Sequence, residues 1–106
     1  MSYYIETSQL KERLENEFLQ GCQTLKKKSF LGSKEVKAKI NWNSNRLTCL
    51  SSLNLQRGNI LYDPINRMSI EITLIEKKRI KYPNEKLSSE DCIFLDICRF
   101  KRVKEA

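Results

Sequence analysis

The sequence predicts one α+β domain over residues 1–106, in which an N-terminal amphipathic helix packs on a four- to five-stranded antiparallel meander sheet. Two observations lead to this fold class. Apolar residues recur at helical spacing over residues 8–28, and over residues 34–103 they mostly alternate with polar residues at the period of a β-strand. The alternative architecture is a small, partly closed β-barrel with a covering helix.

The predicted helix spans residues 8–28. Its apolar residues are spaced by four, four, four and three positions, which places them on one stripe of a helix. The stripe consists of Leu10, Leu14, Phe18, Cys22 and Leu25. Glutamates precede lysines along the segment, an order that suits the helix dipole. Gly21 lies inside the pattern and marks either a close contact or an early end of the helix.

Residues 34–43 form the clearest predicted strand. One face is apolar and is expected to point to the core: Val36, Ala38, Ile40 and Trp42. The opposite face is basic and carries amides: Lys37, Lys39, Asn41 and Asn43. A turn over residues 43–45 leads to the next strand, so Lys37 and Lys39 are expected to lie near Arg46 and Thr48.

Four further strands are predicted after this turn, one of which is short. Residues 46–56 form a strand with a bulge at Ser51 and Ser52, residues 60–62 form a short strand that ends before Pro64, and residues 67–76 form a third. The third strand is expected to turn four residues inward: Met68, Ile70, Ile72 and Leu74. Residues 92–103 form the last strand.

The last strand is apolar on both faces, which is typical of a strand that is central, covered on both sides or at an interface. The candidate interface residues are Phe94, Cys98 and Phe100. Asp96 interrupts one apolar face. We expect it to pair with a neighbouring Lys or Arg or to lie exposed near a strand end, and a buried carboxylate is the alternative.

The formal net charge is +7, and most of it follows residue 33. A basic surface favours an anionic partner, such as nucleic acid or an acidic protein surface, and a merely solvated surface is the alternative. Phosphate contacts come from Lys and Arg side chains. The candidate nucleic-acid-binding residues are Lys37, Lys39, Arg46, Lys77, Lys78, Arg79, Arg99, Lys101 and Arg102. Base stacking has weak support, because Trp42 falls on the apolar face of its strand.

Several classes of chemistry are excluded. The chain has no histidine, so it cannot contain a Ser-His-Asp triad, a Cys-His pair or a histidine-dependent zinc site. Its glycines are scattered and form no phosphate-binding loop. The four cysteines form no Cys-x-x-Cys pair and are expected to be reduced and buried. We therefore expect no catalysis, no cofactor and no metal.

The sequence thus predicts a small basic, non-enzymatic protein that binds nucleic acid through a Lys/Arg-rich sheet face. The alternative is a protein-interaction or accessory subunit that assembles with a partner, or with a second copy, through the last strand. A more distant alternative is a small β-barrel that binds an apolar ligand. No apolar run approaches the roughly 20 residues that span a bilayer, and the N-terminus lacks the layout of a secretory signal. We therefore expect a soluble, cytoplasmic protein.

Overall fold

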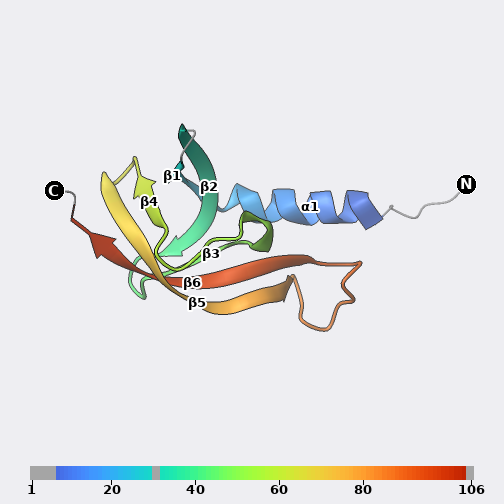
Figure 1. Ribbon diagram of the computed structural model, residues 1–106. Helices are drawn as coiled ribbons and strands as arrows, with labels where there is room; N and C mark the ends of the chain where they lie inside the picture. Colours follow the sequence, from blue (N-terminus) through green and yellow to red (C-terminus); the bar gives the residue numbers. More distant parts are fainter. Residues whose placement is uncertain (1–6, 30–31, 105–106) are drawn as a thin grey trace, which may run out of the picture.

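The structure, a computed structural model, describes residues 7–29 and 32–104, which contain one α-helix, one short 3-10 helix and six strands (Figure 1). The strands form a closed antiparallel barrel in the order β1-β2-β3-β6-β5-β4. In chain order the elements are α1 (Thr7–Gln20), β1 (Gln23–Ser29), β2 (Gly32–Asn41), β3 (Arg46–Leu50), η1 (Ser51–Leu53), β4 (Ile60–Asp63), β5 (Met68–Tyr82) and β6 (Ile93–Val103). The barrel alternative therefore fits better than the open meander sheet.

The second half of the predicted helix is a strand. Helix α1 ends at Gln20, and β1 pairs with β2 on one side and with β4 on the other, which closes the barrel. The helix ends where the side chain of Lys39 packs against Gly21, at which an added Cβ would lie 3.0 Å from Lys39 Cε. Leu25, which fits the helical stripe, is instead buried in the barrel opposite Val36. The prediction of a helix over residues 8–28 is therefore confirmed as far as residue 20 and wrong for residues 23–28, which belong to β1.

The central strands follow the predicted alternation, with different bounds: β2 begins and ends two residues earlier than predicted, and β3 is shorter than predicted. Strand β2 ends at Asn41 and β3 at Leu50, after which η1 and a left-handed residue, Asn54, turn the chain. The prediction of a strand over residues 46–56 was therefore too long. Within β3 the buried residues are Leu47 and Cys49.

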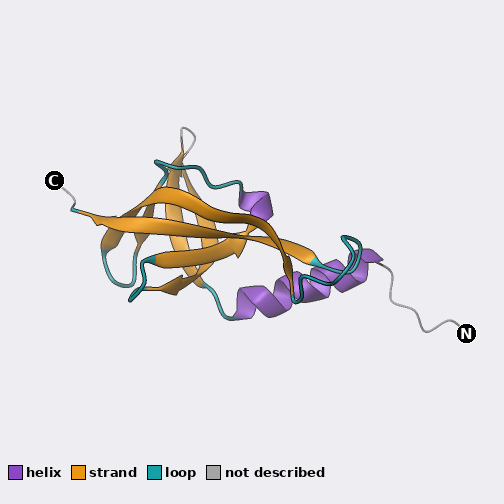
Figure 2. Cartoon of the chain, turned by 90° about the horizontal axis from the view of Figure 1, so that it is seen from below, coloured by secondary structure: helices purple, strands orange, loops and turns teal. Residues whose placement is uncertain are grey.

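Strand β5 is longer than predicted and contains three register shifts against β6. One shift falls between Ile72 and Leu74, and it turns Leu74 outward, where half of its surface is exposed. The expectation that Leu74 points inward was wrong because a bulge reverses the alternation. Beyond the barrel, β5 and β6 continue as a hairpin beside α1 (Figures 1 and 2).

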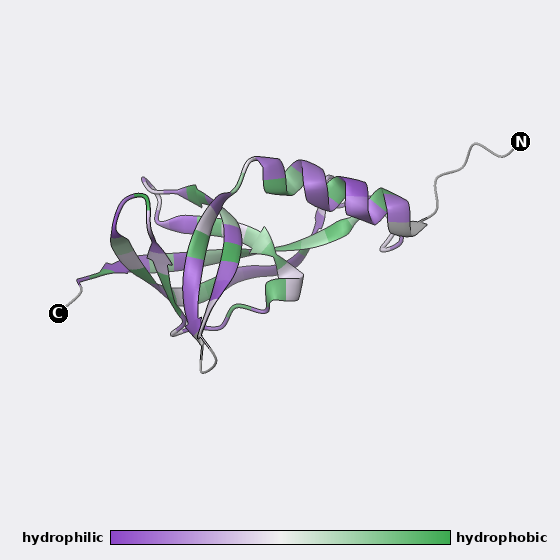
Figure 3. Cartoon of the chain, turned by 90° about the horizontal axis from the view of Figure 1, so that it is seen from above, coloured by the Kyte–Doolittle hydropathy of each residue, from purple (hydrophilic) through white to green (hydrophobic). Residues whose placement is uncertain are grey.

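Two apolar clusters hold the fold together. The barrel interior contains Leu25, Val36, Leu47, Leu61, Ile70, Ile72 and Phe100, among others. A second cluster joins Leu14 and Phe18 of α1 to Ile93 and Leu95 of β6. Apolar and polar segments alternate along the strands and around the helix (Figure 3). The fold thus buries its apolar residues in two separate places.

The two apolar faces of β6 are explained by these two clusters. Cys98 and Phe100, which the sequence marks as interface candidates, are buried in the barrel interior with 0 % and 4 % of their surface exposed. Residues on the other face, Ile93 and Leu95, pack against α1. Each face of β6 is therefore covered along the part that carries these apolar residues, and Cys98 and Phe100 are core residues.

The cysteines are free thiols, and Cys49, Cys92 and Cys98 are buried. A hydrogen bond with Cys98, together with burial, raises the pKa of the Cys49 thiol. Among the described residues, no helix is both long and apolar enough to cross a membrane.

Candidate functional site

Five of the nine candidate nucleic-acid-binding residues share the outer surface of three neighbouring strands. The ladder pairs Lys39 with Thr48, Asn41 with Arg46, and Arg46 with Arg99, as expected from the predicted hairpin. These residues point outward because they alternate with residues of the barrel interior. We call this set the basic face, and it consists of Lys37, Lys39, Arg46, Arg99 and Lys101.

The centre of the basic face is a pair of arginines that share one carboxylate. Arg46 and Arg99 are directly opposite each other across β3 and β6. Arg46 Nη2 donates to Glu76 Oε1 at 3.2 Å, and Arg99 Nε donates to Glu76 Oε2 at 3.2 Å. The hydrogen bond from Arg99 and the charge of Arg46 hold the pKa of Glu76 below its ordinary value. Two cations therefore remain with one ionised partner.

The lysines of the basic face differ in their surroundings. Lys101 Nζ lies 3.7 Å from a carboxylate oxygen of Glu71. Lys39 Nζ lies 4.9 Å from the ring centroid of Phe18, a cation–π contact with the helix. Lys37 is exposed and has no ion-pair partner within residues 7–29 and 32–104. The face thus combines anchored and free ammonium groups.

Amides contribute less to this surface than the sequence suggests. Asn41 Oδ1 accepts hydrogen bonds from the backbone N–H groups of Asn43 and Ser44, which closes the turn after β2. The amide oxygen is therefore used locally. A shallow hollow of about 310 Å³ does lie beside it, between Lys39, Arg46 and their neighbours on β2, β3 and β6.

Of the other four candidate residues, Lys77 borders the basic face, because it is opposite Ile97 of β6 and Ile97 is opposite Thr48. The remaining three lie outside that face. Lys77, Lys78 and Arg79 follow one another on β5, where its register against β6 shifts. Arg102 lies near the turn after β2, with its guanidinium carbon 5.7 Å from the ring centroid of Trp42. Trp42 is half-buried and packs edge-to-face on Phe100. The nine residues therefore do not form one continuous site.

Asp96 has a different role from the one expected. It is fully buried, and its Oδ1 accepts hydrogen bonds from Ser51 Oγ at 2.5 Å and from the backbone N–H of Arg79 at 2.9 Å. The expectation of an ion pair or an exposed position was wrong, and the alternative, a buried carboxylate, is correct. The sequence feature that indicates burial of Asp96 is its position as a charged residue between apolar residues on one face of β6.

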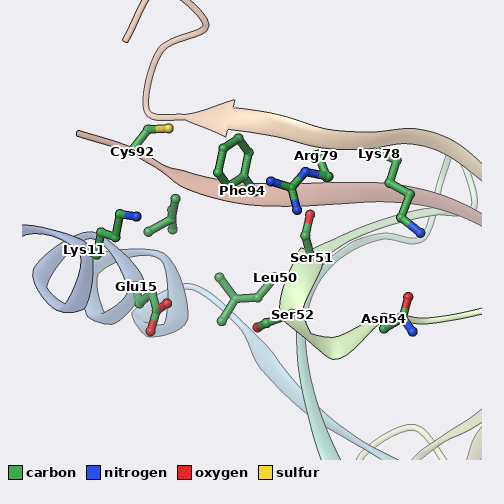
Figure 4. A pocket seen from close by; sticks show the side chains of 11 residues that line it. Lys11, Glu15, Leu50, Ser51, Ser52, Asn54, Lys78, Arg79, Cys92 and Phe94 are labelled. Carbon is green, nitrogen blue, oxygen red and sulfur yellow. The ribbon is translucent and has the colours of Figure 1, made fainter. Parts of the chain in front are cut away.

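A groove opens above this carboxylate, between α1, η1 and the β5–β6 hairpin (Figure 4). Its volume is about 460 Å³. Its walls are formed by Lys11, Glu15, Leu50, Ser51, Ser52, Asn54, Lys78, Arg79, Cys92, Ile93 and Phe94. Phe94, an interface candidate in the sequence, is half-buried in this wall. Sequence patterns do not reveal the groove, because four separate segments form it.

Within the described part of the chain, no group of three or more Cys, Asp or Glu side chains is placed to hold a metal ion. Comparison with protein-family models, with curated proteins and with solved structures gave no match for this chain. Function therefore has to be argued from the two surfaces themselves, the basic face and the groove.

Proposed function

We propose that this protein binds nucleic acid through the basic face, by contacts to phosphate groups. The observation that carries the proposal is the pairing of Arg46 with Arg99 across β3 and β6. Like charges directly opposite each other destabilise a sheet, and the single carboxylate of Glu76 leaves this pair with a net positive charge. A bound phosphate supplies the second negative charge.

The spacing of the face also supports phosphate contacts. Neighbouring strands are about 4.8 Å apart, and alternate residues along one strand are about 7 Å apart. The five cations of the face therefore form a regular positive surface, which the carboxylates of Glu71 and Glu76 balance only in part. Such a surface suits a backbone of repeated negative charges.

Base recognition has no comparable support. Stacking requires an exposed aromatic or Arg plane. The basic face contains no aromatic residue, and the guanidinium groups of Arg46 and Arg99 are both hydrogen-bonded to Glu76. Trp42, at its edge, is half-buried against Phe100. We therefore expect binding that depends strongly on salt and weakly on base sequence.

The other two candidate functions have less support. Assembly through β6 needs an uncovered apolar face. Cys98 and Phe100 lie in the barrel, Ile93 and Leu95 pack on α1, and the exposed part of the strand carries Arg99 and Lys101. An apolar ligand needs space inside the barrel. An eight-stranded barrel is just wide enough for side chains to fill, and side chains already pack the interior of this six-stranded one.

The experiment is a titration of labelled single- and double-stranded DNA and RNA oligonucleotides, followed by fluorescence anisotropy between about 50 and 200 mM salt. Five cations less two carboxylates give about three neutralised phosphates, so log K should fall against log[salt] with a slope of roughly −2 to −3. In the variant K37Q/R46Q the slope should become shallower by roughly 1.4–1.8.

The matched control is R57Q/K86Q, which removes the same charge from exposed positions outside the basic face. It should leave the slope nearly unchanged. No binding at the low-salt end, or an equal loss in both double variants, would contradict the proposal. Circular dichroism establishes that each variant is folded.

A further inference from the structure

The groove between α1, η1 and the β5–β6 hairpin is lined by charged, polar and apolar side chains (Figure 4). Its volume of about 460 Å³ lies within the range of small-molecule sites. Three cations, Lys11, Lys78 and Arg79, and one carboxylate, Glu15, line it. The charged side chains that line the groove therefore carry a net positive charge, and its volume fits a small molecule.

A bulge in β5 brings two of these cations to the groove. The ladder pairs Lys77 with Ile97 and then Ile80 with Leu95, so two residues of β5 lie opposite the single Asp96 of β6 and one of them is extra. Bulges of this kind re-aim side chains and are frequent beside binding sites. Arg79 adopts a left-handed backbone with φ of 55°, a conformation that is uncommon for arginine and costs free energy.

The buried carboxylate of Asp96 holds this conformation. Its Oδ1 accepts the backbone N–H of Arg79, from β5, and the hydroxyl of Ser51, from η1. One buried group therefore fixes two walls of the groove that lie 17 and 45 residues away from it in sequence. Burial of a carboxylate is costly, and what it maintains here is the shape of the groove.

The cationic and apolar parts of the groove meet at Phe94. The guanidinium of Arg79 lies over the ring of Phe94, 4.4 Å from its centroid. Lys78 and Arg79 form no ion pair with any other described residue. Figure 4 shows Arg79 beside Ser51 and Lys78 farther along the groove, toward Asn54, with Phe94 and Leu50 between Arg79 and the helix. An anionic group thus fits at the bulge, and a flat apolar body fits between Phe94 and Leu50.

We propose that the groove binds a small organic anion, in which a flat apolar body carries a phosphate or carboxylate group. The negative group contacts the side chains of Lys78 and Arg79, since the single hydroxyl proton of Ser51 is donated to Asp96. The apolar body lies against Phe94 and Leu50. This site is separate from the basic face, so the proposal does not depend on nucleic-acid binding.

The probes are 2-naphthyl phosphate and 2-naphthoate, titrated into the full chain and followed by calorimetry. At least one should bind about tenfold more tightly than inorganic phosphate and than 2-naphthol, which separates the charged and apolar contributions. The tighter of the two anions identifies the head group. If neither binds below about 10 mM, the proposal is overturned.

The variant K78Q/R79N tests the residues. Asn tolerates the left-handed backbone and keeps the N–H that Asp96 accepts, so the fold is preserved. Its affinity for the tighter probe should fall at least about tenfold. The control K77Q/R57Q removes the same charge from exposed residues outside the groove and should change affinity less than about twofold. An equal loss in both variants overturns the proposal.

Amide chemical shifts of the unmodified protein give a second measurement that needs no variant. Binding in the groove should shift the amides of Ser51, Arg79 and Phe94 most. Shifts concentrated on β2 and β3 instead would place the anion on the basic face and overturn the assignment of the groove.

Discussion

The basic face and the groove both carry Lys and Arg side chains, but regular strand pairing positions them on the face and irregular pairing positions them at the groove. On the face, regular pairing of β3 with β6 sets Arg46 opposite Arg99, and Glu76 compensates part of their charge. At the groove, a break in the pairing of β5 with β6 leaves Lys78 and Arg79 without an ion-pair partner among the described residues. Regular strands thus present a broad shared charge, whereas a bulge concentrates charge at one point.

The largest effect should come from Phe18, which lies between Lys39 of the basic face and Tyr82 of the β5–β6 hairpin. Its ring contacts Lys39 of the basic face and packs edge-to-face on Tyr82 of the hairpin, and it is 1 % exposed. Phe18→Ala should lower the free energy of unfolding by about 3–5 kcal/mol, measured by urea denaturation. Leu10→Ala, on the same stripe but half-buried, should cost clearly less. Equal losses of unfolding free energy in the two variants would show that the contacts of Phe18 with Lys39 and Tyr82 add no stability.

The second effect should be confined to the groove. Asp96→Ala leaves the Ser51 hydroxyl and the Arg79 N–H without an acceptor, and each unpaired buried donor costs roughly 1–3 kcal/mol. Denaturation should show this loss together with weaker binding of the groove probe and unchanged binding of nucleic acid. Asp96→Asn retains an acceptor and should lose less. A stable Asp96→Ala variant with normal probe binding would refute the role of this carboxylate.

The third effect should be confined to the basic face. Glu76→Gln removes the shared carboxylate and leaves the Arg46–Arg99 pair uncompensated. Affinity for an oligonucleotide at about 50 mM salt should rise roughly two- to fivefold, because a screened surface charge is worth about 1 kcal/mol or less. Glu90→Gln, the same change in the exposed loop before β6, serves as the control. An unchanged affinity for Glu76→Gln would count against phosphate binding between the arginines.

The smallest effect is the pH dependence of that same ion pair. The pKa of Glu76 is held below its ordinary value of 4.5 by Arg99 and Arg46, so the folded state favours the ionised form. The stabilisation is fully present above pH 4.5 and is lost as the pH falls through the lowered pKa. The stability difference between the unmodified protein and Glu76→Gln should therefore shrink from pH 7 to pH 3. A difference that is constant with pH would contradict this sign.

Sequence periodicity predicted those parts of both regions that depend on neighbours in the chain. The alternation in β2 and β3 predicted that Lys37, Lys39 and Arg46 share a surface, and the ladder confirms the expected register. The groove was missed, because Ser51 and Arg79 meet only through Asp96. The sequence marks Arg79 as a candidate phosphate contact, but no hydrophobic periodicity indicates its left-handed backbone.

By itself the sequence determined the amphipathic stripe of α1, the alternation of the central strands and the excess of positive charge, since these follow from side-chain order along a few residues. Only the tertiary structure decided that residues 23–29 are a strand, because a strand there pairs with both β2 and β4 and leaves no open edge between them. That long-range closure outweighs the helical spacing of Leu25. The same distinction separates the basic face, which local alternation predicts, from the groove, which requires four distant segments to meet.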